Sequence, residues 1–178
     1  MDEKRILKVA VVGNIAGGKT RLSRRLAQLH DLPLTHVDSI QFLSGLRIRP
    51  FAESVSLLKK IESNDSWLID GYGPLDLIEA RFDQADRVVF IDLPLWQHFW
   101  WAFKRQIKSL WWPRPELPAG SKEFNFLHTK KLINTLWNMH QRMRPELLKI
   151  FAQEKLRDKM IFIKNKKQWR HYFVNGLM

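Results

Sequence analysis

The sequence predicts an α/β protein in which helices cover both faces of a five-stranded parallel sheet, a three-layer sandwich. Two observations lead to this fold class. Short apolar runs alternate along the chain with longer amphipathic segments, the order expected when each strand is followed by a helical crossover. Residues 13–20 read G-N-I-A-G-G-K-T and fit the phosphate-binding pattern G-x-x-x-x-G-K-[ST], directly after the first apolar run.

The elements follow in order from these runs. The five predicted strands are residues 6–12, 34–37, 67–69, 88–91 and 160–163. The predicted helices are residues 21–27, 51–63, a long segment from Pro94 to Trp112, 132–143, one that begins at Pro145, and a short one at the end of the chain. Three prolines and a glycine between residues 113 and 120 break the chain into a loop. Ligands of such a sheet bind at the carboxyl ends of its strands.

The loop from Gly13 to Thr20 predicts a nucleoside triphosphate site. Gly13 and Gly18 let backbone N–H groups close around phosphate oxygens, and the helix that follows directs its positive dipole end at the anion. Lys19 can reach the β- and γ-phosphates, and the Thr20 hydroxyl can bind Mg²⁺. The predicted nucleotide contacts are Gly13, Asn14, Ile15, Ala16, Gly17, Gly18, Lys19 and Thr20. The alternative is a chance match in a glycine-rich turn.

Three carboxylates, Asp38, Asp70 and Asp92, each directly follow a predicted strand. A Mg²⁺-nucleotide site needs an acidic group near the loop threonine, and a kinase also needs a base or an orienting group for its acceptor. Position alone does not assign these roles, and Asp-Gly after a strand is also a common turn signal.

The net charge of +12 is unevenly distributed. Residues 1–103 carry 13 Lys/Arg and 13 Asp/Glu, whereas residues 104–178 carry 17 and 5. The basic part could neutralise phosphate charge during phosphoryl transfer, or bind nucleic acid or an anionic membrane. A solvated basic face is the plain alternative.

The length of 178 residues is enough for one globular domain, 1–178, with a full core. The chain has no cysteine, which excludes thiol chemistry and thiolate metal sites. No segment has the length or composition of a membrane span, and the first apolar run fits a strand better than a signal peptide. We expect a cytoplasmic protein.

A tryptophan-rich segment lies between Trp96 and Trp112, interleaved with Lys104, Arg105 and Lys108. Trp96, Trp100 and Phe103 have helical spacing, which favours packing on the core with the cations outside. Binding to a membrane interface, or stacking on single-stranded nucleic acid, is the alternative.

Taken together, the loop, the Leu-Ile-Asp70-Gly71 element and the Phe-Ile-Asp92-Leu-Pro94 element resemble the adenylate-kinase-like P-loop NTPases and kinases. Within them the chain is most similar to the bacterial group labelled topology modulation protein, or FlaR-related. The features that carry this narrower resemblance are His36-Val37-Asp38, Asp70-Gly71-Tyr72-Gly73, Arg81 and Arg114-Pro115-Glu116.

The resemblance implies a nucleoside-monophosphate-kinase-like fold with a helical lid and acceptor-side insertion at about residues 104–145. It implies that Asp70 rather than Asp92 is the carboxylate near Mg²⁺, and that Asp38 faces the acceptor. Arginines would approach the phosphates when the lid closes: Arg81, Arg105, Arg114, Arg142 and Arg144. In this family an arginine ends the Asp-Gly-aromatic-Pro-Arg element and contacts the acceptor. The corresponding stretch here ends in Leu75, so Arg47 or Arg49 could contact the acceptor instead.

We therefore expect an ATP-binding, Mg²⁺-dependent phosphotransferase that acts on a small molecule, such as a nucleotide or nucleoside. The predicted catalytic residues are Lys19, Asp38, Arg81 and Arg114; Arg105 joins the nucleotide contacts, and Thr20 and Asp70 are the metal-side residues. The alternative is a P-loop ATPase whose basic half binds nucleic acid.

Overall fold

The computed structural model describes residues 6–44, 47–109 and 126–177, and it confirms the predicted sheet. The five strands are all parallel in the order β2-β5-β1-β6-β7. Their bounds are β1 Lys8–Gly13, β2 Leu34–His36, β5 Trp67–Asp70, β6 Arg87–Ile91 and β7 Met160–Ile163. The strand that carries the glycine-rich loop therefore lies at the centre, between β5 and β6.

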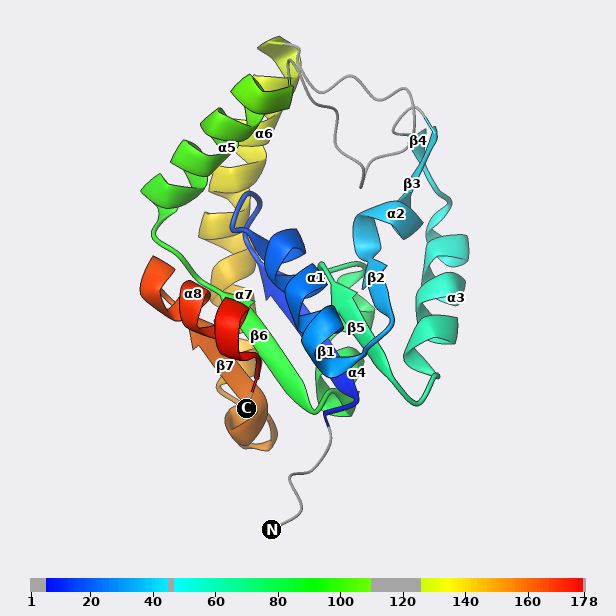
Figure 1. Ribbon diagram of the computed structural model, residues 1–178. Coiled ribbons are helices and arrows are strands. Elements are labelled where there is room, and N and C mark those ends of the chain that lie inside the picture. Colours follow the sequence, from blue (N-terminus) through cyan, green and yellow to red (C-terminus); the bar gives the residue numbers. More distant parts are fainter. Residues whose placement is uncertain (1–5, 45–46, 110–125, 178) are drawn as a thin grey trace.

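Helices cover both faces of this sheet, because side chains alternate between the two faces along each strand. In β1, Val9 and Val11 face the core shared with α1 (Lys19–His30) and α8 (Lys166–Asn175). Ala10 and Val12 face the opposite core, to which α3 (Phe51–Glu62), α4 (Leu75–Gln84) and α7 (Arg144–Phe151) contribute. This arrangement is the three-layer sandwich expected from the sequence (Figure 1).

Two long helices pack beside each other at the end of the molecule where the strands have their carboxyl ends (Figure 1). They are α5 (Leu95–Ser109) and α6 (Phe126–Asn138). α6 continues through a π-helical turn, η2 (Met139–Met143), into α7, because the residues at both junctions keep right-handed helical dihedrals. No helix among the described residues is long and apolar enough to cross a bilayer.

Several short elements are not predicted by the sequence. Residues 37–41 form the helix α2, and an antiparallel pair follows it, β3 (Phe42–Leu43) and β4 (Arg47–Ile48). Residues 154–159 form a 3₁₀ turn, η3, before β7. The helix α4 also belongs to this group, although Ile78 and Phe82 are fully buried against the sheet.

The predicted orientation of the tryptophan-rich helix is wrong. Trp96, Trp100 and Phe103 are 65%, 49% and 58% exposed, so they do not pack on the core. The buried face of α5 instead contains His98 and Ala102, which are 1% and 4% exposed. Helical spacing shows which residues share one side of a helix, but not which side is buried. In α5 the buried side is the one that contacts the glycine-rich loop.

Candidate nucleotide-binding site

At two positions in the loop between β1 and α1, the backbone conformation requires glycine. Gly13 has a φ of 149°, and a Cβ there would lie 2.5 Å from the Ile91 carbonyl oxygen on the neighbouring strand β6. Gly18, just before α1, has a φ of 76°, in the left-handed region. The buried strand thus turns sharply into the helix, and the first-turn N–H groups of α1 face the loop.

Polar contacts inside the loop hold its residues together. The Asn14 side chain accepts a hydrogen bond from the Ile15 N–H at 2.8 Å and donates one to the Leu136 carbonyl of α6 at 3.1 Å. Lys19 Nζ folds back over the loop and donates to the Asn14 carbonyl at 3.0 Å. A lysine at this place in a phosphate-binding loop can pair with the phosphates of a bound nucleotide.

His98 supports the loop from α5. Its Nδ1 lies 2.8 Å from the Ile15 carbonyl oxygen, and a Cβ on Gly17 would be 3.0 Å from its Cε1. Burial lowers the pKa of His98, and the nearby charge of Lys19 lowers it further, so the ring is neutral and Nδ1–H donates to Ile15. No spacing rule in the sequence relates position 98 to position 15, so sequence analysis missed this residue.

Two indoles lie against the last glycine of the loop. A Cβ on Gly18 would be 3.1 Å from Trp169 Nε1 and 3.3 Å from the ring of Trp101. The Trp169 Nε1 is buried, without a hydrogen-bond partner in the described part of the chain. Trp169 itself is held by stacking on Phe173 at 5.0 Å and by the Arg21 guanidinium above its ring.

Asp70 ends β5 next to the strand that leads into the loop. It is opposite Val11 in the strand register, and Gly71 N–H donates to the Val11 carbonyl at 3.0 Å. The carboxylate is 5% exposed, and its Oδ2 lies 3.0 Å from His36 Nδ1. Its Oδ1 is buried and has no hydrogen-bond partner among the described residues. A buried carboxylate oxygen without a partner is costly, and a hydrated metal ion would satisfy it.

These residues fit Mg²⁺ that is bound together with a nucleotide. The described part of the chain contains no group of three or more acidic or histidine side chains that could enclose a metal. Mg²⁺ rarely needs such a group, because it usually keeps several waters and binds one or two protein oxygens plus phosphates. The Thr20 hydroxyl, in the first turn of α1, and Asp70, at the carboxyl end of β5, are oxygen donors of this kind.

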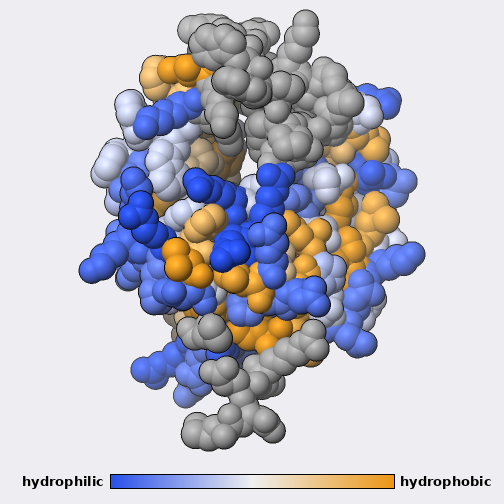
Figure 2. All heavy atoms as spheres, viewed as in Figure 1, coloured by the Kyte–Doolittle hydropathy of each residue, from blue (hydrophilic) through white to orange (hydrophobic). Residues whose placement is uncertain are grey.

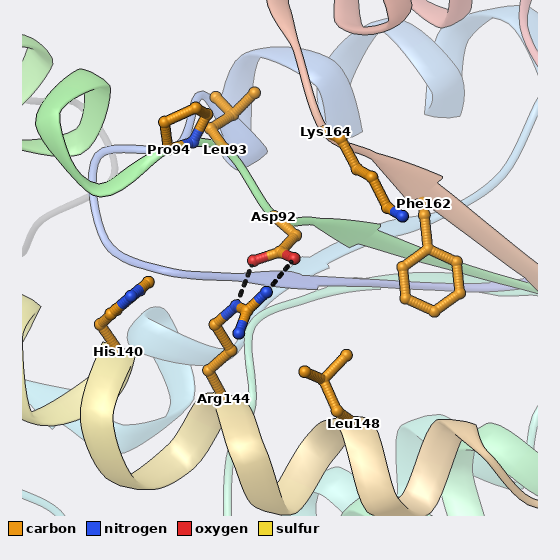
Figure 3. Close-up of a pocket in the computed structure, with 8 residues that line it drawn as sticks. All are labelled: Asp92, Leu93, Pro94, His140, Arg144, Leu148, Phe162 and Lys164. Carbon is orange, nitrogen blue, oxygen red and sulfur yellow. Dashed lines mark hydrogen bonds and ion pairs between the residues drawn. The ribbon is translucent and has the colours of Figure 1, made fainter.

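Asp92, the other strand-end carboxylate beside the loop, is already paired. Arg144 of α7 donates to it twice, from Nε at 2.6 Å and from Nη2 at 2.8 Å, and this hydrogen bonding raises the pKa of Arg144 (Figure 3). The pair lies in a pocket of about 430 Å³ between β6, β7 and the α6–α7 helical run. His140 and Lys164 point toward the same pocket (Figure 3). A carboxylate bound bidentately by arginine is less suited to a metal than Asp70 is.

Arg81 lies beneath the turn after Asp70. It is fully buried, and its Nε lies 2.7 Å from Glu62 Oε1. Its Nη1 donates to the carbonyls of Gly71 and Tyr72 at 3.1 and 2.8 Å. The structure therefore brings Arg81 to the Asp70–Gly71 turn, where it holds the backbone, and not to Lys19.

Tyr72 joins the same turn to the loop. Burial raises the pKa of Tyr72, and the nearby Gly13 backbone opposes part of that rise. Asp70, Arg81 and the start of the loop are thus linked through the residues of one turn.

The remaining predicted site residues are spread around this centre. Asp38 lies in the first turn of α2, directly after β2, and is exposed. Arg49 donates to the Ile40 carbonyl at 2.7 Å, whereas Arg47 and Arg142 are exposed. Arg105 belongs to α5, but its side chain lies outside the described part, as does the whole of Arg114.

A buried central strand, a phosphate-type loop and a following helix, in a parallel sheet of this order, define the P-loop fold of the kinase type. A shikimate kinase from Acinetobacter baumannii has this fold, with a TM-score of 0.55 and 15% identity over 94% of this chain and 89% of that one. A shikimate kinase from Bacteroides thetaiotaomicron superposes less closely, with a TM-score of 0.48 and 12% identity over 94% of this chain and 94% of that one. For a shikimate kinase from Aquifex aeolicus the TM-score is 0.44, with 15% identity over 80% of this chain and 99% of that one.

Sequence comparison gives a further similar protein. The tRNA dimethylallyltransferase 2 of Geotalea daltonii is 34% identical over 85 residues, which are 48% of this chain and 24% of that enzyme. The match thus spans about a quarter of the length of that curated relative. No family model matches the chain.

Proposed function

We propose that this protein is an ATP- and Mg²⁺-dependent phosphotransferase that acts on a small-molecule acceptor. The observation that carries the proposal is the buried Oδ1 of Asp70, which has no hydrogen-bond partner among the described residues. This oxygen lies beside a loop whose lysine, Lys19, donates to the loop backbone. If the loop only shaped the backbone, there would be no need for a neighbouring carboxylate oxygen that is buried without a partner.

The nucleotide would bind along residues 13–20. Backbone N–H groups of the loop and of the first turn of α1 would surround the β- and γ-phosphates, and Lys19 would exchange the Asn14 carbonyl for phosphate oxygens. The Thr20 hydroxyl would bind the metal directly and Asp70 would hold its water shell, with His36 fixing the orientation of the carboxylate. When bound, Mg²⁺ would neutralise charge that develops on the phosphates.

The acceptor would approach from the side of α2. Its oxygen attacks the γ-phosphorus, the bond from that phosphorus to the β–γ bridging oxygen breaks, and ADP leaves with the electron pair. The acceptor proton passes to Asp38 or to water. Asp38 suits this role because it follows β2, which pairs with β5 and thus places Asp38 at the same sheet edge as Asp70.

A single domain, 1–178, would close over this site through residues 104–145. Arg105, Arg114 and Arg142 are the cations available for the transferred phosphoryl group. Arg105 follows His98 by seven residues, two turns of the helix that contacts the loop. Arg81 would act differently, as a positioning residue that holds the turn carrying Asp70. We place the reaction in the cytoplasm.

A nucleic-acid-associated ATPase, of the topology-modulation type, is the second candidate. The observation that favours it is the charge of residues 104–178, with 17 Lys/Arg against 5 Asp/Glu. The name of the Geotalea relative also makes tRNA worth testing as an acceptor.

The test follows the γ-phosphate of labelled ATP in the presence of Mg²⁺. Nucleoside monophosphates, nucleosides, small hydroxy acids, tRNA and single-stranded DNA are added separately. The proposal expects label in one small-molecule product in a 1:1 ratio with ADP, reduced in Asp38→Asn. Free phosphate as the sole labelled product, with turnover raised only by a nucleic acid, would overturn it in favour of the ATPase.

A further inference from the structure

One side of α5 exposes a row of large apolar side chains. Trp96, Trp100, Phe103 and Ile107 are 65%, 49%, 58% and 42% exposed, and we call these four residues the exposed α5 face. Their spacing of four, three and four residues places them on one narrow side of the helix. Together with Phe99 the first three line a shallow groove of about 500 Å³. Figure 2 shows orange, pale and blue atoms together on the side of the molecule where α5 and α6 lie.

This face does not contribute to the fold or to the loop. The opposite side of α5 makes those contacts, through His98 against Ile15 and Trp101 against Gly18. Single exposed apolar residues are ordinary, but a contiguous row of four large ones marks an interaction surface. The helix α6, which packs beside α5, exposes two more, Ile133 and Trp137.

The charge around this face selects an anionic occupant. Neither α5 nor α6 contains an aspartate or glutamate, whereas the sequence of the two helices contains five Lys/Arg, among them Lys104, whose side chain is exposed. A second copy of this chain would therefore bring like charges together across the interface, which is unfavourable. An anionic surface with an apolar layer beneath it would satisfy both the cations and the apolar side chains.

The arrangement of the rings favours a lipid surface over a nucleobase. Trp100 is stacked with Phe103, with centroids 6.3 Å apart and planes at 22°, and the Lys104 ammonium lies over the Trp100 ring at 4.7 Å. A base would have to displace one of these neighbours to stack on Trp100. Ile107 offers no ring for stacking, whereas a bilayer interface accommodates tryptophan, phenylalanine and isoleucine alike.

We propose that the exposed α5 face docks this protein on the surface of an anionic lipid bilayer. The helix lies in the plane of the interface, with the four apolar side chains below the headgroups and Lys104 among the lipid anions. The opposite side of the same helix remains on the glycine-rich loop, so docking leaves the nucleotide site accessible from the aqueous side.

The test is co-sedimentation of the full chain with vesicles of phosphatidylcholine alone and of phosphatidylcholine with phosphatidylglycerol. We expect binding to the mixed vesicles that weakens with added salt. The variant Trp96→Ser/Trp100→Ser/Phe103→Ser should bind at least about tenfold more weakly, because the three inserted side chains are gone. Ile48→Ser/Phe51→Ser is the matched control, since those side chains are 79% and 64% exposed elsewhere and its binding should be unchanged.

Thermal unfolding checks that the triple variant is folded. Lys104→Glu is an independent second variant, which reverses the charge of an exposed cation without changing an apolar residue, and it should weaken the preference for the mixed vesicles. Equal binding by wild type and both variants would overturn the proposal.

Two other results would also overturn it by assigning the face to another partner. One is binding of single-stranded DNA through Trp96 and Trp100 without binding to vesicles. The other is a wild-type dimer in solution that the triple variant converts to a monomer, again without binding to vesicles.

Discussion

At the scale of single residues, His98 shows how the loop depends on a distant part of the chain. Its ring is buried, donates to the Ile15 carbonyl and fills the space beside Gly17. Lys19 and Asp92 are the charged groups that act on it. Because burial lowers the pKa of His98, the folded state prefers the neutral ring, and this preference links the stability of the loop to pH.

We predict that the free energy of unfolding falls as pH drops below about 6.5, the ordinary histidine value, because the unfolded chain then takes up a proton that folded His98 does not. His30, whose pKa burial also lowers, adds to the same trend. In His98→Asn, whose amide can replace the Nδ1–H donor, the fall should be smaller. Urea unfolding of both proteins above and below this pH measures it. Equal falls in the two proteins would show that His98 does not titrate in this way.

Lys19 is the residue on which triphosphate binding should depend most. Lys19→Ala removes the ammonium that would pair with the phosphates, so we expect nucleotide affinity to fall by about 100-fold, as for loss of charge-assisted hydrogen bonds. Calorimetric titration with ATP measures this. Lys166→Ala, an exposed lysine in the first turn of α8, is the control and should bind like wild type. Unchanged affinity in Lys19→Ala would place the nucleotide elsewhere.

The sequence predicts the loop residues but not their supports. The motif from Gly13 to Thr20 is local, so spacing alone identifies it, and the strand before it and helix after it are where the pattern requires them. His98 and Trp169 reach the loop from elements far along the chain, and only the tertiary packing brings them there. The unpartnered state of Asp70 Oδ1 is likewise a property of the packed site.

At the scale of elements, amphipathic spacing identifies helices better than it identifies the direction they face. The helix α5 has two apolar sides, one with His98, Trp101 and Ala102 and one with Trp96 and Trp100. The spacing of the second side is the clearer signal, yet the first side is buried. The sequence pattern also fails to reveal the helix α4. Its few buried apolar residues lie beside the charged Arg81, which interrupts the apolar spacing.

The π-helical turn η2 is a further feature that spacing does not reveal. It separates Leu136, whose carbonyl accepts from Asn14, from Arg144, which pairs with Asp92. A π turn changes the phase of the helix and disturbs its regular hydrogen bonding. The continuous run from α6 to α7 thereby contacts both the loop and the end of β6.

The turn between β5 and α4 provides a prediction about Arg81. Arg81→Leu leaves Glu62 buried without its partner, so we expect a loss of about 3–5 kcal/mol in the free energy of unfolding. The double variant Arg81→Leu/Glu62→Leu should recover most of this loss, because no charge is then buried alone. Urea unfolding of both variants measures it. Unchanged stability with lost ATP turnover would instead make Arg81 a phosphate contact.

At the scale of the whole molecule, the net charge of +12 should oppose folding through repulsion among the cations. We predict that moderate NaCl raises the melting temperature, because salt screens this repulsion. The variant Lys166→Glu/Lys167→Glu, which alters two exposed cations, should show a smaller rise. Differential scanning fluorimetry across a salt series measures both. A melting temperature that falls with salt would indicate that ion pairs outweigh the repulsion.

Magnesium dependence of nucleotide affinity is the measurement that bears most directly on the proposed site. Asp70 ends β5 and Asp92 directly follows β6, but Asp70 has an unpartnered buried oxygen among the described residues and Asp92 is bound by Arg144. We predict that Asp70→Asn raises the Mg²⁺ concentration needed for ATP binding about 10- to 100-fold, whereas Asp92→Asn leaves it unchanged. If Asp92→Asn carried the effect and Asp70→Asn did not, the metal would lie on the other side of the loop and the proposed site would be wrong.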